Sequence, residues 1–312
     1  MNLRVSILRR ATRGGVVVIA VVAVAAVAVT VAMGGSKHGY SPWGEATLVA
    51  GDGVNTPAAE GCPIVSPNDK ELYFASTRAG GVSGNTANDI WVSHRTSKNG
   101  QWGPPVNMGE PVNSAASDYC PSPMEGNVFF FVSTRGGGCG GADIYMLDDN
   151  GPGPDTAVNV GCTVNSSGAE WSPYLMRAGG QTYLFFSSDG HGGAGGQDIF
   201  MSKLGKDGFE TPVAVSGGVN TSANEFRPNL RKDGLEMVFD SDRAGSPGSQ
   251  TDVYSTTRES LDAPWGAVTP VGSANTPAGE SRASFSWDGT TLYFGRAGDI
   301  YSVSRTKNGG ND

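Results

Sequence analysis

The same order of short motifs recurs five times in this chain, and the repetition constrains the fold more than any other feature. Each copy begins at an asparagine, reaches an acidic residue five positions later, and continues through an apolar run to an Asp followed by two apolar residues. The copies begin at Asn55, Asn113, Asn165, Asn220 and Asn275, in steps of 58, 52, 55 and 55 residues. A fixed period of this size indicates one supersecondary unit repeated along the chain.

Each copy contains four segments with the pattern of a β-strand. In the first copy they are residues 60–66, 71–77, 89–93 and 102–108. Composition favours an all-β chain, because apolar residues reach only 38% while 47 glycines and 18 prolines supply many turns. Four antiparallel strands at this spacing are typical of one propeller blade. The sequence therefore predicts a five-bladed β-propeller of four-stranded antiparallel blades, with an open solenoid as the alternative.

The two ends of the array predict how the ring closes. The fifth copy lacks a fourth strand pattern after 301–305, whereas an unassigned pattern at 43–54 precedes the first copy. We expect this N-terminal strand to complete the last blade, because closure removes exposed sheet edges. The predicted parts are a basic tip and apolar helix (1–34), a linker (35–42) and the propeller (43–312), with blades starting near residues 55, 113, 165, 220 and 275.

Residues 16–33 form an uncharged run, rich in Val and Ala, that four arginines and no acidic residue precede. The positive-inside rule places the N-terminus in the cytoplasm and the repeats outside it. The run from Val16 to Met33 is longer than the core of most signal peptides and close to the minimum for a membrane span. We therefore favour an anchor on the extracytoplasmic side of the cell envelope, with secretion after signal cleavage as the alternative.

Beyond that segment the chain carries 18 basic and 30 acidic groups, which repel phosphate backbones, so we expect no nucleic-acid partner. Four cysteines lie on the exported side, where disulfides form. Propeller loops of one rim would bring Cys139 and Cys162 together, and we predict that bridge. Cys62 and Cys120 would then pair by default. Their side chains should point the same way round the ring, which argues against that second bridge.

The stretch 286–294 reads Ser-x-Asp-Gly-x-x-Leu-Tyr-Phe, and Asp299-Ile300-Tyr301 follows it after a glycine. This pattern resembles the WD-repeat-like propeller units of TolB-type proteins, and the resemblance spans residues 43 to about 305. It implies a binding scaffold in the bacterial envelope, usually a platform for protein interactions. Apart from calcium, we expect no cofactor. The TolB-type propeller has more blades and an additional domain, so its partners are not carried over to this chain.

An acidic residue opens the inner strand of every copy, and carboxylates near a propeller axis would suit a glycosidase funnel. Paired positions of an antiparallel hairpin have a constant index sum, which puts a basic residue opposite the acid in four copies. Repeated pairs favour a structural role, because catalysis needs carboxylates in unlike environments. The predicted ion pairs are Glu60–Arg78, Asp118–Arg135, Glu225–Arg243 and Glu280–Arg296.

The third copy breaks this pattern, because Glu170 faces Asp189 and His191 instead of an arginine. Calcium at Glu170 and Asp189 would supply the missing charge, since it takes carboxylate oxygens on loops. Trp171 would offer a stacking surface for a sugar. A drifted repeat with a solvated loop is the structural alternative. The candidate binding residues are Glu170, Trp171, Asp189 and His191.

These features favour an exported, membrane-tethered and non-catalytic propeller that binds a protein or an envelope polysaccharide on the rim where the inner strands begin. The alternative is a five-bladed glycoside hydrolase or lyase that acts on polysaccharide through funnel carboxylates. We assign no catalytic residue, because neither His38 nor His94 has a fixed Ser or Cys partner. The ligand and the oligomeric state are left open.

Overall fold

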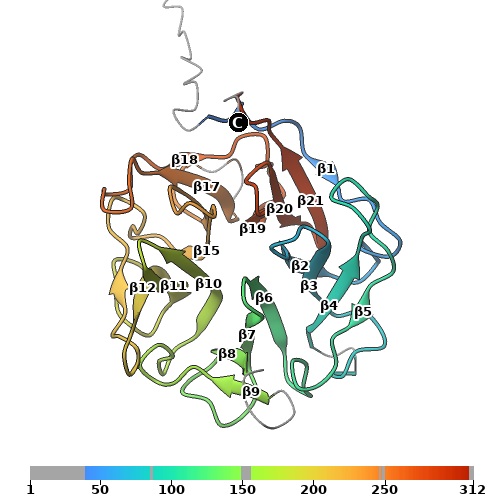
Figure 1. The fold of residues 1–312 in the computed structure, drawn as a ribbon, viewed down its shortest axis with the longest axis horizontal. Coiled ribbons are helices and arrows are strands. Elements are labelled where there is room, and N and C mark those ends of the chain that lie inside the picture. Colours follow the sequence, from blue (N-terminus) through green and yellow to red (C-terminus); the bar gives the residue numbers. More distant parts are fainter. Residues whose placement is uncertain (1–38, 85–86, 149–155, 246, 248–249, 309–312) are drawn as a thin grey trace, which may run out of the picture. The chain divides into compact units, whose positions relative to one another are not determined.

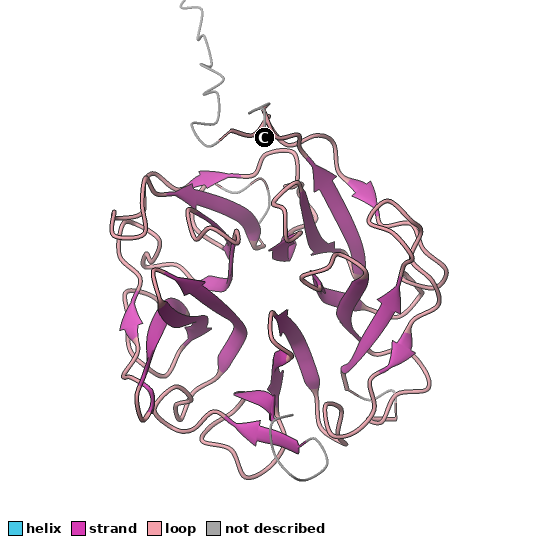
Figure 2. Ribbon diagram, in the orientation of Figure 1, coloured by secondary structure: helices cyan, strands magenta, loops and turns pink. Residues whose placement is uncertain are grey.

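The computed structural model describes residues 39–84, 87–148, 156–245, 247 and 250–308. Gly35–Asp312 is one compact unit, in which five antiparallel sheets surround a central axis (Figures 1 and 2). The fold is the predicted all-β, five-bladed propeller. The predicted helix of segment 1–34 lies outside the described residues. Among the residues that are described, we find no helix with the length and hydropathy to cross a bilayer.

The blades follow one another along the chain, each with its first strand at the axis (Figure 1). Blade one contains β2 (Glu60–Val65), β3 (Glu71–Ser76), β4 (Asp89–His94) and β5 (Val106–Asn107). Blade two contains β6 (Asp118–Met124), β7 (Val128–Ser133), β8 (Asp143–Asp148) and β9 (Thr156–Asn159). Blade three contains β10 (Glu170–Ala178), β11 (Gln181–Ser188), β12 (Asp198–Gly205), β13 (Gly208–Phe209) and β14 (Val213–Ala214).

Blade four contains β15 (Glu225–Leu230), β16 (Glu236–Ser241), β17 (Asp252–Thr257) and β18 (Thr269–Pro270). Blade five contains β19 (Glu280–Phe285), β20 (Thr291–Arg296), β21 (Asp299–Ser304) and, as its outer strand, β1 (Thr47–Leu48). Thr47 pairs with Ser302 and Leu48 with Tyr301, in antiparallel register. The predicted closure by the N-terminal strand is therefore confirmed.

The asparagine that marks the period ties each blade to the one before it. Asn113 Oδ1 accepts a hydrogen bond from Ile90 N at 2.7 Å, and its Nδ2 donates to Ile90 O at 2.9 Å. Asn55 binds Ile300 of the last blade in the same way and so helps to close the ring. The equivalent pairs are Asn165–Ile144, Asn220–Ile199 and Asn275–Val253.

The second strands supply the core between the blades. One phenylalanine in each is fully buried, and burial of such a ring contributes about 1.5–3 kcal/mol. The five are Phe74, Phe131, Phe186, Phe239 and Phe294.

Every inner strand contains a β-bulge that the sequence analysis did not predict. In β2 the register with β3 shifts between Gly61 and Ile64, and the other four inner strands shift at the same place. The third residue of each strand has a positive φ of 48–61°, which is uncommon for residues with a Cβ. These residues are Cys62, Cys120, Ser172, Arg227 and Arg282. They line a cavity between the inner strands, which we call the axial channel.

Candidate functional site

The acids that open the inner strands are buried at the rim where those strands begin, which we call the start rim. Glu60 accepts hydrogen bonds from Thr56 N at 3.0 Å, Thr56 Oγ1 at 2.7 Å and Arg78 Nη2 at 3.0 Å. It is 4% exposed, and the other four acids are fully buried. Each acid and its donors form a unit that we call a latch. The acids therefore brace the blades, as the structural interpretation of the repeated acids predicts, and these five do not form the funnel of reactive carboxylates that stood as the alternative.

The structure contains all four ion pairs expected from the hairpin count. Their N–O distances are 3.0, 2.8, 3.1 and 2.7 Å for Glu60–Arg78, Asp118–Arg135, Glu225–Arg243 and Glu280–Arg296. The arginine does more than neutralise the acid. Arg78 Nη2 also donates to Val54 O at 2.7 Å, and its guanidinium lies 4.9 Å from the Phe74 ring centre.

In blade three, His191 takes the place of that arginine. Its Nε2 lies 2.6 Å from Val164 O, the carbonyl equivalent to Val54 O, and its ring packs against Phe186 and Phe200. Glu170 accepts hydrogen bonds from Ser166 N and Oγ and from Ser188 Oγ, at 2.9, 2.5 and 2.7 Å. Within the described residues it has no cationic partner. The latch of blade three thus keeps its hydrogen bonds but lacks the ion pair.

The other two candidates of blade three are also engaged. Asp189 Oδ1 accepts from Ala169 N at 2.7 Å. Trp171 packs against Phe226 at 5.7 Å between ring centres and against the Arg227 guanidinium at 5.0 Å, so it supports the neighbouring inner strand. No group of three or more His, Cys, Asp or Glu side chains suited to a metal occurs in the described ranges. The calcium site at Glu170 and Asp189 stays a prediction without geometric support.

Both disulfides are present, Cys139–Cys162 with a Cα separation of 5.5 Å and Cys62–Cys120 with one of 4.8 Å. The argument against Cys62–Cys120 was wrong because it assumed regular strands. At the bulges the two side chains lie on the axis, where the neighbouring inner strands β2 and β6 come together. The sequence signal was the proline that directly follows Cys62 and Cys120, since a proline within a strand is confined to edges or bulges.

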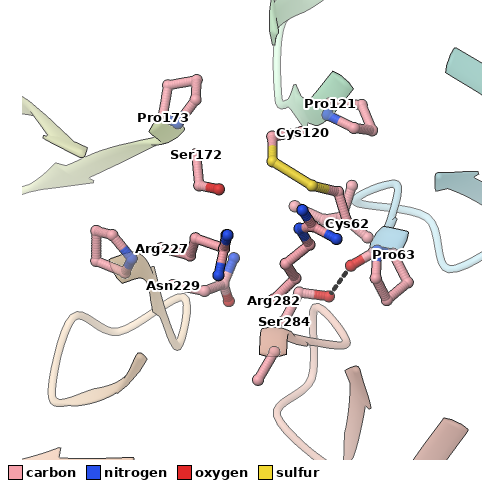
Figure 3. Close-up of a pocket in the computed structure, with 13 residues that line it drawn as sticks. Cys62, Pro63, Cys120, Pro121, Ser172, Pro173, Arg227, Asn229, Arg282 and Ser284 are labelled. Carbon is pink, nitrogen blue, oxygen red and sulfur yellow. Dashed lines mark hydrogen bonds between the residues drawn. A yellow bond between two sulfur atoms is a disulfide. The ribbon is translucent and has the colours of Figure 1, made fainter. Parts of the chain in front are cut away.

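The axial channel is the first site that sequence reasoning missed. The third to fifth residues of the inner strands enclose a cavity of about 30 Å³, in which Ser172, Arg227, Arg282 and the Cys62–Cys120 disulfide surround one space (Figure 3). Arg227 Nη1 lies 2.8 Å from Asp240 Oδ2. Asp240 is fully buried; burial raises its pKa, and Arg227 opposes that rise.

The second missed site lies on the opposite rim, formed by the turns between the first two strands of each blade, which we call the turn rim. A hollow of about 400 Å³ between blades one and two is lined by Glu71, Tyr73, Glu125 and Phe129, among others. We call it the turn-rim hollow. Its available signal was the turn Glu125-Gly126, the only one of the five equivalent turns in the sequence that contains a glutamate; the others read Asn-Asp, Gly-Gly, Asp-Gly and Asp-Gly.

The two carboxylates of the turn-rim hollow have unlike surroundings. Glu71 is 32% exposed and accepts a hydrogen bond from Tyr73 OH at 3.3 Å. Burial, reinforced by Glu71, raises the pKa of Tyr73. Glu125 is 54% exposed and lies 3.0 Å from Lys232 Nζ. The rings of Tyr73 and Phe129 are 5.3 Å apart, so apolar surface adjoins both acids.

A smaller pocket of about 60 Å³ adjoins this hollow and shares Met124 and Glu125 with it. Its lining adds Arg177 of blade three, Lys232 of blade four and Trp287 of blade five. Lys232 Nζ lies 4.8 Å from the Trp287 ring centre. The polar and aromatic surface therefore continues across the turn rim beyond blades one and two.

Comparison with known proteins gives matches by structure only. No protein-family model and no curated protein matches the chain. The α-L-arabinofuranosidase PaAbf62A from Podospora anserina, solved with cellotriose, has a TM-score of 0.54 at 10% identity and covers 86% of this chain and 97% of its own. An α-L-arabinofuranosidase from Lactobacillus brevis has 0.53 at 14% identity, over 80% and 90%. A TolB from Agrobacterium tumefaciens has 0.44 at 15% identity, over 77% and 70%.

At these identities the likeness shows the five-bladed fold. It also corrects the preferred reading of the sequence, which was a non-catalytic binder of the TolB type. The matching structures with TM-scores of 0.50 or more include several glycoside hydrolases, whereas the TolB score is too low to support an argument. The comparison favours the glycoside hydrolase or lyase that stood as the alternative.

Proposed function

We propose that the protein is a carbohydrate-active enzyme that hydrolyses polysaccharide, with the turn-rim hollow as its active site. One observation carries this: Glu71 and Glu125, two partly exposed carboxylates in unlike surroundings, line one hollow of about 400 Å³. Ligand pockets are typically about 300–1,000 Å³. The fold shared with arabinofuranosidases, one of them solved with cellotriose, supports the same reading.

The chemistry requires two carboxyl groups beside the scissile bond. One protonates the leaving oxygen, and the other activates water or attacks the sugar directly. We assign proton donation to Glu71, which lines the hollow and accepts a hydrogen bond from Tyr73 OH. We assign the role of base or nucleophile to Glu125, whose partner is the cation Lys232. Glu71 and Glu125 thus take the catalytic role that the funnel alternative gave to the start-rim acids, whose oxygens already accept hydrogen bonds within the latches.

The rings around these acids would hold the glycan. Tyr73 and Phe129 line the hollow, and Trp287 continues the surface toward blade five. Sugar faces pack well on aromatic rings, which carry a large apolar surface. We further propose that the enzyme acts outside the cytoplasm, tethered by residues 16–33, because the charge pattern around that run favours export of the propeller. The resemblance to WD-repeat-like units then concerns the repeat alone.

The test is to incubate the full-length protein with arabinan, xylan, polygalacturonate and cello-oligosaccharides and to measure new reducing ends. We expect cleavage of at least one polymer. Glu71→Gln and Glu125→Gln should each lower kcat by about 10²- to 10⁴-fold, the usual contribution of a positioned acid or base. Glu210→Gln, which changes an exposed glutamate of blade three, is the matched control and should keep full activity.

Three results would overturn this proposal. If the wild type cleaves and both variants cleave equally well, the turn-rim hollow is not the active site. If the products carry the ultraviolet absorbance of an unsaturated uronate, the reaction is elimination rather than hydrolysis. Absence of cleavage across acidic and neutral polymers would remove the enzymatic assignment itself.

A further inference from the structure

The axial channel contains an arginine whose side chain has no partner. Within the described residues Arg282 makes no side-chain ion pair or hydrogen bond, and its Nε is buried without an acceptor. Its Nη1 lies against Gly61 of blade one, so close that a Cβ at position 61 would be 2.6 Å away. Burial, and then the like charge of Arg227, lower the pKa of Arg282 to about 10, which leaves it charged at neutral pH.

The charges around the channel do not balance. Arg227 pairs with Asp240, and Asp240 also accepts from Arg282 N with its two oxygens, at 2.8 and 2.9 Å. Two guanidiniums and one carboxylate leave a net charge of +1. The Nε of Arg227 is buried without an acceptor as well. A partly buried cation beside a like charge is unfavourable unless an anion completes the group.

The space is shaped for a small group. Ser172, Arg227 and Arg282 face it from blades three, four and five, and the Cys62–Cys120 disulfide closes it on the side of blades one and two (Figure 3). A cavity of about 30 Å³ holds on the order of two water molecules, so a carboxylate fits and a sugar ring does not. The positive φ of all three residues shows that the backbone accepts strain to place them there.

We propose that the axial channel is a carboxylate-binding site, in which the guanidiniums of Arg227 and Arg282 hold the two oxygens and the Ser172 hydroxyl is a third donor. The planar fork of a guanidinium matches a carboxylate in a bidentate way. A monoanion neutralises the net charge of +1, whereas a phosphate dianion would exceed it. The channel shares no lining residue with the turn-rim hollow, so the site does not depend on glycan hydrolysis.

The experiment is a calorimetric titration of the full-length protein with acetate, glucuronate, glucose and inorganic phosphate. Acetate should bind. Glucuronate should bind more weakly, because its ring must stay outside the cavity. Glucose should not bind, and phosphate should bind more weakly than acetate. Arg282→Gln should weaken acetate binding about tenfold or more, the effect of losing a charged hydrogen-bond donor. Arg177→Gln removes the same charge from an exposed position and should leave acetate affinity unchanged.

Thermal unfolding separates binding from a structural role. Because Arg282 lacks an internal partner, Arg282→Gln should raise the melting temperature without ligand while it weakens acetate binding. The proposal is overturned if the wild type does not bind acetate, if phosphate binds more tightly than acetate, or if Arg282→Gln lowers the melting temperature and leaves acetate affinity unchanged. Ser172→Ala, a smaller change, should weaken acetate binding with little effect on folding.

Discussion

Blades three and four build the same latch from different residues. In blade four, Glu225 accepts hydrogen bonds from Thr221 and lies 3.1 Å from Arg243, which also donates to Val219 O. In blade three the equivalent carbonyl contact comes from His191, and Glu170 is left with hydrogen bonds from serines and no ion pair among the described residues.

The difference shows which part of the latch the fold requires. Both blades keep the contact with the carbonyl before the repeated asparagine and the packing against the buried phenylalanine. Only the cation is missing from blade three. The fold therefore tolerates a latch without an ion pair, and the missing arginine does not by itself mark a binding site. The bulge residues on the axis are different: their chemistry varies from blade to blade although their backbone conformation repeats.

The largest expected effect comes from removing the charge of each acid. Glu225→Gln should destabilise the fold by about 3 kcal/mol, because it removes the fully buried carboxylate that pairs with the partly buried Arg243. Glu170→Gln leaves no cation behind and should cost only about 1 kcal/mol, the net worth of a weakened hydrogen bond. Denaturant unfolding of both variants measures the difference. Equal losses would show that the ion pair adds nothing to the latch.

A second test concerns Arg282, which, unlike the arginines of the latches, has no acidic partner for its side chain among the described residues. Its pKa falls on folding to about 10, so folding disfavours its charged form. The resulting penalty is complete below pH 10 and disappears as the pH rises toward the unfolded value. Arg282→Gln should therefore be more stable than wild type at neutral pH, with an advantage that shrinks above pH 10. Chemical unfolding at several pH values checks this, and an advantage independent of pH would contradict it.

The smallest effect should come from restoring the arginine of blade three. His191→Arg puts a cation opposite Glu170 and should stabilise the protein by at most about 1 kcal/mol, because a partly exposed ion pair contributes little. The control is Gln101→Arg at an exposed position of blade one, which should change nothing. Melting temperatures of the two variants provide the comparison. If His191→Arg instead destabilised the protein, the packing of blade three would require the imidazole ring.

Much of the architecture could be predicted from the sequence because its signals are local or repeated. The spacing from Asn55 onward indicated five blades, and the unpaired pattern at 43–54 indicated the closing strand. The hairpin count also brought Glu60 near Arg78, although the bulge puts Ser76 rather than Thr77 or Arg78 directly opposite Glu60. Arg78 still reaches the acid because a long side chain tolerates an error of one or two positions.

The candidate sites could not be predicted in the same way. A bulge at Cys62 or Arg227 reverses the direction of one side chain, and alternation counted along a regular strand assigns that residue wrongly. Glu71 and Glu125 are 54 residues apart and belong to different blades, so no local pattern connects them. Their shared hollow exists because two blades stack side by side.

The sequence by itself determined the number of blades, their order and the way the ring closes, because these follow from periodicity and from short hairpins within each repeat. Only the tertiary structure decided which polar groups meet at the axis and on the turn rim. The physical reason is that each repeat contributes only two or three residues to the axis. The five bulge residues acquire a common chemistry, including the unpaired charge of Arg282, only when the ring brings them together.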